Sequence, residues 1–370
     1  MKFTVETNVL NEALKKAGAT LSQKDNTPLF RNFALKAKDD KLTIMSTDTD
    51  LATICVVPVT NVEEGEVTIP GAKFQNIAKL TDSQNITVES EGTSIKVFSE
   101  TTNYVLQGLD ASEFPELAVI TNQDTKKADR AQFLENLNRI SFSISDNEAR
   151  KNLLAVFIAK GYIQASDGHV SSVCKFDSQL DNLLIPSSAV TELVKVLRNS
   201  AADSVEIASD GNFLLFKLND DLFSCRLSQA KFPDIVGKLL IPTEKNDIKI
   251  EVDKNLFERA VKRVSITSNI SSFAINLEVT GNKMKMSSDN ADGDKSSETL
   301  PCVASGDYSC SLHYEYLLDI CKSTVGDKII MKAHNNIRVP IRFENDDFVS
   351  LLMRLVPPTP KAEESETEKK

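Results

Sequence analysis

The segment Ser166-Asp167-Gly168-His169 places a hydroxyl, a carboxylate and an imidazole within four residues. These groups form the catalytic triad of many hydrolases, but triad members normally come from separated loops that hold the base against the nucleophile. Asp-Gly is also a typical sequence for a tight turn between two strands. The spacing therefore favours a turn that shapes a surface, and an enzyme that uses His169 remains the alternative.

Two further groups of residues could bind a metal or react. Asp48 and Asp50 stand two positions apart, but no glycine-rich or carboxylate-dense loop accompanies them, as a calcium site would require. His313 and His334 stand alone. The six cysteines form no CxxC pair, and the chain has no P-loop, GxGxxG or HExxH motif. We therefore expect cysteines in the core, no metal, no cofactor and no catalytic residues.

The elements that must position these residues repeat along the chain. Aspartates at 48, 167 and 289 are separated by 119 and 122 residues, and each follows an apolar helical run and two strand-like runs. Prolines 70 and 186 precede second helical runs, as prolines at helix starts do. The predicted helices cover 9–16, 133–140 and 256–263, then 74–80, 190–197 and 316–322.

Each copy reads roughly as βαβββαβββ. Short strands with few helices indicate an α+β domain built on antiparallel sheets. Polar stretches near 121–127 and 243–247 mark the boundaries, so we predict domains at 1–122, 128–244 and 248–355. Residues 356–370 are rich in proline and charge, and we predict that this C-terminal tail is disordered.

The charge of the chain is unevenly distributed. With 43 basic and 53 acidic residues the net charge is −10, which is not typical of a nucleic-acid-binding protein. The predicted helices nevertheless carry more basic than acidic residues, so a surface lined by them would attract phosphates without reading bases. Ordinary solvated helix faces remain an alternative explanation. No apolar run reaches membrane-spanning length and no signal peptide is apparent, so we expect a cytoplasmic protein without a membrane partner.

Four short motifs stand in a specific order. They are Met1-Lys2-Phe3-Thr4-Val5, Ser166-Asp167-Gly168-His169, Phe232-Pro233-Asp234 and Met353-Arg354-Leu355. Together with the threefold repeat, residues 1–355 resemble the bacterial DNA polymerase III beta subunit family. The resemblance implies a sliding clamp in DNA replication, a non-enzymatic processivity factor. Two chains would form a homodimeric ring of six similar domains around double-stranded DNA, without sequence specificity.

The resemblance also gives expected positions for the ring. The DNA-facing candidates are the basic residues of the helices and of one loop: Lys15, Lys16, Lys24, Lys73, Lys79, Arg139, Lys195, Arg198, Arg259 and Lys262. The candidates for the dimer interface are Tyr104, Leu106 and Ile266. Strand edges of the first domain would meet strand edges of the third domain of the partner copy.

The family binds peptides from the DNA polymerase III catalytic subunit, the clamp loader, other clamp-binding polymerases and repair proteins. An apolar groove with a few polar anchors suits such extended peptides. The matching positions would line a cleft between the second and third domains: Leu153, Ser166, Gly168, His169, Val170, Pro233, Val349, Met353, Arg354 and Leu355. The tail after Leu355 is expected to compete weakly with these peptides.

Some positions depart from the family pattern. Val170 and Leu352 replace residues that are commonly basic and proline, and Ser187-Ser188 stands where a basic pair is common. The usual arginines after Asp234 are also absent. The alternative function is therefore a divergent scaffold that binds partner peptides without being loaded on DNA.

Overall fold

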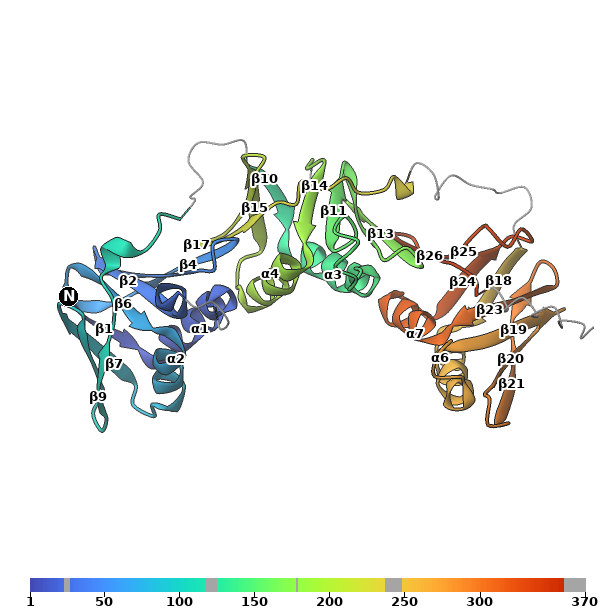
Figure 1. The fold of residues 1–370 in the computed structure, drawn as a ribbon, viewed down its shortest axis with the longest axis horizontal. Coiled ribbons are helices and arrows are strands. Elements are labelled where there is room, and N and C mark those ends of the chain that lie inside the picture. The colour runs from blue at the N-terminus through green and yellow to red at the C-terminus, as the bar shows by residue number, and fades with distance from the viewer. Residues whose placement is uncertain (23–26, 118–124, 178, 237–247, 356–370) are drawn as a thin grey trace, which may run out of the picture. The chain divides into compact units, whose positions relative to one another are not determined.

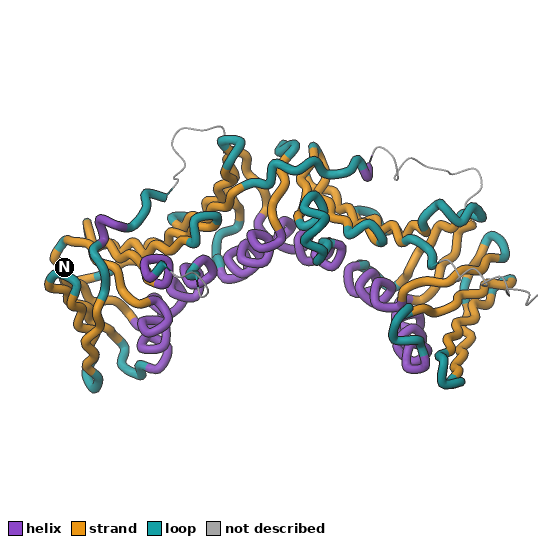
Figure 2. The backbone as a smooth tube through the Cα atoms, in the orientation of Figure 1, coloured by secondary structure: helices purple, strands orange, loops and turns teal. Residues whose placement is uncertain are grey.

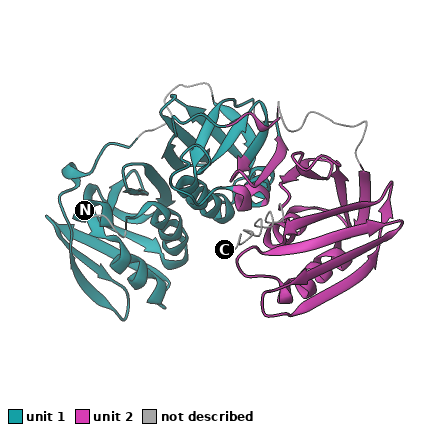
Figure 3. Cartoon of the chain, turned by 45° about the vertical axis from the view of Figure 1, so that its right-hand side comes forward, with its two compact units in different colours: residues 1–138, 144–164, 176–232 teal, residues 139–143, 165–175, 233–370 magenta. Residues whose placement is uncertain are grey.

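The computed structural model describes residues 1–22, 27–117, 125–177, 179–236 and 248–355. They fall into two compact units. Unit 1 holds 1–138, 144–164 and 176–232, and unit 2 holds 139–143, 165–175 and the residues from 233 onward (Figure 3). Lys24, most of both predicted domain linkers and the C-terminal tail lie outside the described residues.

Unit 1 contains two complete antiparallel sheets and part of a third (Figure 1). In spatial order the five-stranded sheet is β5 (Thr60–Glu63), β1 (Lys2–Glu6), β7 (Asn85–Glu91), β8 (Ser94–Phe98) and β9 (Asn103–Gln107). The eight-stranded sheet is β10 (Lys126–Asp129), β15 (Ser204–Ser209), β16 (Phe213–Leu218), β17 (Asp221–Arg226), β4 (Leu51–Pro58), β3 (Lys41–Thr47), β2 (Asn32–Lys38) and β6 (Gly65–Pro70). Strand β11 (Ala155–Ala159) pairs with β12 (Gly161–Ser166) and β14 (Leu183–Pro186).

Unit 2 also contains antiparallel sheets. The first runs through β13 (Val170–Phe176), β26 (Phe348–Leu352), β25 (Ile341–Glu344), β24 (Lys328–Ala333), β18 (Ile248–Asp253) and β22 (Val303–Ala304). The second is four-stranded, with β21 (Lys295–Pro301), β20 (Lys283–Asp289), β19 (Ala274–Thr280) and β23 (Tyr308–His313).

The helices of each unit lie on one side of its sheets (Figure 2). Unit 1 holds α1 (Thr7–Ala17), α2 (Gly71–Leu80), α4 (Ser187–Asn199) and most of α3 (Arg130–Ile140), and unit 2 holds α6 (Lys254–Val264) and α7 (Tyr314–Ser323). Apolar residues at helical spacing bury one face of each helix, as with Leu10, Leu14 and Ala17 of α1. Helices α2 and α4 begin directly after Pro70 and Pro186, which confirms the prediction from these prolines. Short 3₁₀ turns include η5 (Ser265–Thr267).

The strand order repeats three times. The set β6-β2-β3-β4 has its counterparts in β14, β11, β12 and β13 and in β23-β19-β20-β21. The set β1-β7-β8-β9 has its counterparts in β10-β15-β16-β17 and β18-β24-β25-β26. The expected antiparallel α+β repeat is confirmed, but the pattern βαβββαβββ is too short. It omits the strand after each corner aspartate, namely β4, β13 and β21.

Candidate functional site

A compact turn, Ser166–Val170, joins β12 to β13; we call it corner 2. The Ser166 hydroxyl donates to the Val170 carbonyl at 3.0 Å and accepts from the Gly168 N–H at 3.1 Å. Oδ1 of Asp167 accepts the backbone N–H groups of His169 and Val170 at 2.7 and 2.8 Å. Gly168 has φ +93°, a conformation that favours glycine. The Ser166 hydroxyl and one carboxylate oxygen of Asp167 are thus bonded to the backbone, and the His169 side chain is exposed.

Aromatic residues from α7, from the end of β23 and from the turn before β19 pack beside corner 2. The Tyr316 hydroxyl donates to the second carboxylate oxygen of Asp167. The His313 ring lies 4.7 Å from the ring of Tyr316 and 4.9 Å from that of Phe273. Burial lowers the pKa of His313. Phe273 has φ +51°, which is strained for a bulky residue. Tyr316 and Phe273 were not among the predicted site residues. The sequence signal for Tyr316 was the pair of tyrosines, Tyr314 and Tyr316, near the start of the predicted helix.

The end of the described chain is fastened on both sides. The Met353 N–H donates to the His169 carbonyl at 2.9 Å, and the Leu355 N–H donates to the Ser311 carbonyl at 2.9 Å. Nη1 of Arg354 donates to the Tyr308 hydroxyl at 2.9 Å, and Nη2 donates to two carbonyls of the 336–339 turn. Arg354 therefore fixes the chain end, whereas Met353 leaves 39% of its surface exposed beside His169.

The other predicted cleft residues differ from one another in how exposed they are. Pro233 is exposed and Val349 is partly exposed. Ser166 is buried, and Val170 is 1% exposed within the apolar core of unit 2. The prediction that the Val170 side chain lines a cleft is therefore corrected, because its inward position on β13 packs it into the core. Leu153 belongs to unit 1, where it is 8% exposed and its carbonyl accepts the Ser145 N–H.

The predicted DNA-facing residues divide into groups. Some are exposed but paired with an acidic residue one turn away on the same helix, namely Lys15 with Glu12, Lys195 with Glu192 and Lys262 with Glu258. Others are exposed and have no ion pair within the described part of the chain: Lys73, Lys79, Arg198 and Arg259. Among the predicted DNA-facing residues, the charges of this last group are the ones best placed to contact phosphates.

Arg139 is the clearest correction. Its side chain is 6% exposed, its Nε donates to the Ser323 carbonyl at 2.8 Å, and its Nη1 lies 2.9 Å from Asp347. The guanidinium also stacks over the ring of Phe348 at 4.8 Å. A charge held in this way links helix to strand and cannot present itself to DNA, so the prediction that Arg139 faces DNA is wrong.

Lys16 is held within unit 1. Its Nζ lies 2.7 Å from Asp221, and the two side chains are 18% and 14% exposed. Asp221 also accepts the Val56 N–H at 3.2 Å through its other oxygen. The ammonium group therefore fastens α1 to β17, and Lys16 is corrected from a DNA-facing residue to a structural one.

The dimer-interface candidates lie beside edge strands. Among the described residues, β9 and β21 are each hydrogen-bonded to a strand on one side only. On β9, Tyr104 is 40% exposed, while Leu106 packs partly against the core. Ile266, in η5, is 81% exposed. Thr267 of the same turn contacts Ser296 of β21 at 2.6 Å between hydroxyl oxygens, so Ile266 lies near that edge.

The groups considered for chemistry are committed to structural contacts. Asp48 accepts two backbone N–H groups, and Asp50 pairs with Arg226. Burial raises the pKa of Cys225 and of Cys321 to about 12, which suppresses their thiolates. Across the described ranges no cluster of three or more His, Cys, Asp or Glu side chains could hold a metal ion. Among those same residues, no helix is long and apolar enough to cross a membrane.

Three copies of a domain with two helices on antiparallel sheets define a protein of the DNA-clamp class. Models of the DNA polymerase III beta subunit match the N-terminal domain at residues 1–118, the central domain at 127–234 and the C-terminal domain at 238–355. The chain therefore belongs to the DNA polymerase III beta subunit family, the replication processivity factors, and it is a DNA sliding clamp.

Individual relatives agree with this assignment. The beta sliding clamp of Vibrio cholerae is 26% identical over 340 residues, which cover 89% of this chain and 92% of the relative. That of Escherichia coli K12 is 24% identical, covering 91% and 94%. The solved sliding clamp of Bacillus subtilis superposes with a TM-score of 0.89 at 22% identity, covering 96% and 99%. A Pseudomonas aeruginosa clamp bound to griselimycin gives 0.88 at 20% identity, covering 96% and 100%.

Proposed function

We propose that two copies of this chain join head to tail into a closed ring around duplex DNA and tether the replicative polymerase to it. The observation that carries the proposal is the pairing of equivalent strands. Strand β4 pairs with β17, and its counterpart β13 pairs with β26, the counterpart of β17. The third pair of counterparts, β21 and β9, is left unpaired among the described residues.

The two free edges suit each other. An exposed strand edge readily pairs with another chain, and a head-to-tail interface closes when the rotation between copies permits it. Tyr104 and Val105 expose 40% and 60% of their surfaces on β9, and Ile266 exposes 81% beside β21. Together these residues would supply the apolar contact at each of two identical joints, with Leu106 extending it from the domain core.

The helices would supply the DNA-facing surface. Attraction between exposed basic side chains and phosphates is independent of base sequence and permits sliding. The exposed, unpaired set Lys73, Lys79, Arg198 and Arg259 supports this role best. The residues Lys15, Lys195 and Lys262 would also attract phosphates once each exchanged its acidic partner for a phosphate group. Such surface ion pairs contribute little free energy individually.

Corner 2 is the proposed docking site for partner peptides. His169 and Met353 offer an exposed polar and apolar pair, fixed by the backbone contact between them. Peptides of the polymerase III catalytic subunit, the clamp loader, other polymerases and repair proteins are the proposed ligands. Gly168, Pro233, Val349 and Leu355 would complete the surface around that pair, and the site would have no catalytic role.

The domain bounds that accompany this proposal are 1–122, 128–244 and 248–355. They are supported by the family-model matches, whose ends lie within a few residues of them at most boundaries. A replication factor of this class would act in the cytoplasm, in contact with chromosomal DNA.

The ring can be tested by its topology. The purified chain is loaded onto nicked circular DNA by the cognate loader, and retention is measured before and after the circle is cut at a single site. A ring that encircles DNA is retained on the circle and lost from the free ends. Equal retention on circular and linear DNA would refute encirclement.

A further inference from the structure

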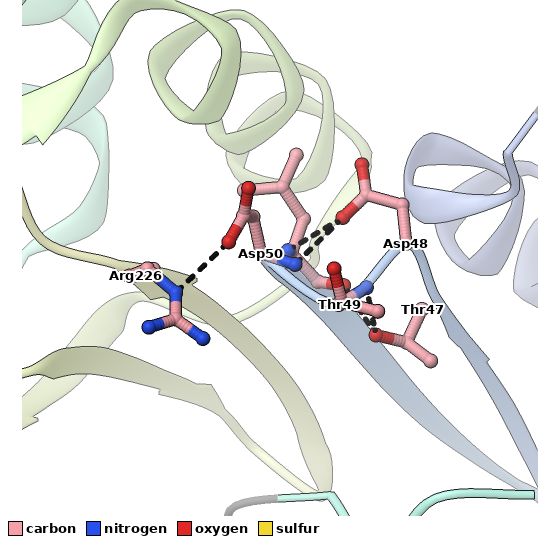
Figure 4. Close-up of polar contacts among 6 residues, drawn as sticks. Thr47, Asp48, Thr49, Asp50 and Arg226 are labelled. Atoms are coloured by element: carbon pink, nitrogen blue, oxygen red, sulfur yellow. Dashed lines mark hydrogen bonds and ion pairs between the residues drawn. The ribbon is translucent and has the colours of Figure 1, made fainter. Parts of the chain in front are cut away.

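Unit 1 contains a turn with the same hydrogen bonds as corner 2. In this turn, Thr47–Leu51 (corner 1), the Thr47 hydroxyl donates to the Leu51 carbonyl at 2.8 Å and accepts from the Thr49 N–H at 3.0 Å. Oδ1 of Asp48 accepts the N–H groups of Asp50 and Leu51 at 3.1 and 2.7 Å (Figure 4). Each bond has its counterpart in corner 2, so the two turns are structural equivalents.

The strand that follows each corner pairs in the same register with equivalent strands. Leu51 lies opposite Cys225 on β17, and Val170 lies opposite Leu352 on β26. One residue further on, the Arg226 N–H donates to the Asp50 carbonyl at 2.8 Å, and the Met353 N–H donates to the His169 carbonyl at 2.9 Å. Asp50 is therefore the equivalent of His169, and Arg226 is the equivalent of Met353.

The side chains at these equivalent positions differ in kind. Nε of Arg226 lies 2.9 Å from Oδ1 of Asp50 (Figure 4). The guanidinium of Arg226 also lies over the ring of Phe213, 5.0 Å from its centroid. At corner 2 the matching side chains are those of His169 and Met353, which are exposed. At corner 1, therefore, an ion pair occupies the position that corner 2 leaves exposed and that we propose binds a peptide.

We infer that Asp50 and Arg226 close corner 1 to apolar peptides, so that each chain presents one peptide corner and not two. The inference rests on the proposed peptide-binding role of corner 2. Both side chains of the pair are more than half exposed, at 57% for Arg226 and 69% for Asp50, so the pair contributes little to stability. The pair instead opposes peptide binding. An apolar side chain bound at corner 1 would desolvate both charges and separate them, which costs free energy.

The test exchanges the two pairs in the full-length protein. The probe is a fluorescent peptide, chosen as the tightest wild-type binder among overlapping segments of the host polymerase III catalytic subunit. Wild-type protein should bind one peptide per chain. The variant Asp50→His/Arg226→Met should bind a second one, with a Kd within about 100-fold of the first. The reciprocal variant His169→Asp/Met353→Arg should lose the first site, and the fourfold exchange should restore one site per chain.

A charge-reversed variant, Asp50→Arg/Arg226→Asp, is the matched control, because it keeps an ion pair at corner 1 and should bind one peptide. Single-site binding by a folded Asp50→His/Arg226→Met variant, with an unchanged circular dichroism spectrum, would overturn the inference. If that variant does not fold, Arg226→Met alone is measured in the same way and decides by the same stoichiometry. Failure of the wild-type chain to bind any segment would refute the peptide site at corner 2 instead.

Discussion

The ammonium group of Lys16 lies 2.7 Å from Oδ2 of Asp221, and this contact joins two residues that are 205 positions apart in the chain. Both side chains are more than four-fifths buried, and Asp221 also accepts the Val56 N–H. The pair fastens α1 to β17, beside the β4–β17 strand pairing that makes the eight-stranded sheet continuous.

Lys16→Met should destabilise the protein by about 2 kcal/mol, because it leaves the Asp221 carboxylate without its countercharge in a largely buried position. Calorimetric melting should show a lower Tm. Lys15→Met, whose side chain is 62% exposed in a local pair, is the control and should leave the Tm within a degree. Equal effects of the two substitutions would contradict the structural role of Lys16.

Thr49 carries local backbone strain. Its φ is +82°, while the equivalent residue of corner 2 is Gly168 at +93°. Thr49→Gly should raise stability by about 1 kcal/mol, since relief of a left-handed β-branched residue exceeds the entropy cost of glycine. Gly168→Ala, the reverse change at the equivalent position, should lower the Tm. A Thr49→Gly variant that melts below the wild type would show that the threonine side chain stabilises corner 1.

The exposed helix cations should control DNA affinity. Each of Lys73→Ala, Lys79→Ala, Arg198→Ala and Arg259→Ala should reduce the slope of log K against log salt for duplex DNA by up to about 0.9. Fluorescence anisotropy with two unrelated sequences should give the same loss for both. Lys96→Ala, on the outward face of β8, is the matched control and should leave the slope unchanged. A loss confined to Lys96→Ala would place DNA on the strand side.

Acid should weaken the packing beside corner 2. Burial lowers the pKa of His313 below its ordinary 6.5, against the opposing charges of Glu315 and Asp167 and with a small contribution from His169. The His313 imidazole therefore binds a proton more readily in the unfolded chain than in the folded protein. The contribution of neutral His313 to the free energy of unfolding is complete above about pH 6.5 and declines as the pH falls below it. His313→Phe keeps the ring contacts with Phe273 and Tyr316 but cannot titrate. Between pH 7.5 and 5 its Tm should fall less than that of the wild type; identical declines would exclude His313 as the cause.

The repeat and its corners could be predicted from sequence because they depend on local spacing. The predicted corner residue of the third copy, however, was wrong by one position. The sequence pattern aligns Asp289 with Asp48 and Asp167, but by strand register the equivalent residue is Asn290, which accepts the turn N–H groups of Asp292 and Asp294. The structure adds another instance, Ser209–Phe213, whose Asp210 accepts two N–H groups in the same way as Asp48.

Long-range partners could not be predicted in this way. Helical spacing places Arg139 on a helix, but its acceptors, Ser323 and Asp347, lie 184 and 208 residues further along the chain. Tyr316 was overlooked for the same reason, since Asp167 is 149 residues away. Such contacts arise from the packing of distant segments, which a single sequence does not reveal.

The free edges of β9 and β21 have one more consequence. In the proposed head-to-tail joint one edge pairs with the other edge of a different copy, so nothing in the pairing itself limits assembly to two chains. Only the curvature accumulated along each chain decides whether the second joint meets the first or another molecule is added. A substitution that changes this curvature without touching either edge should convert rings into open, growing filaments, visible as a rise in mass with protein concentration.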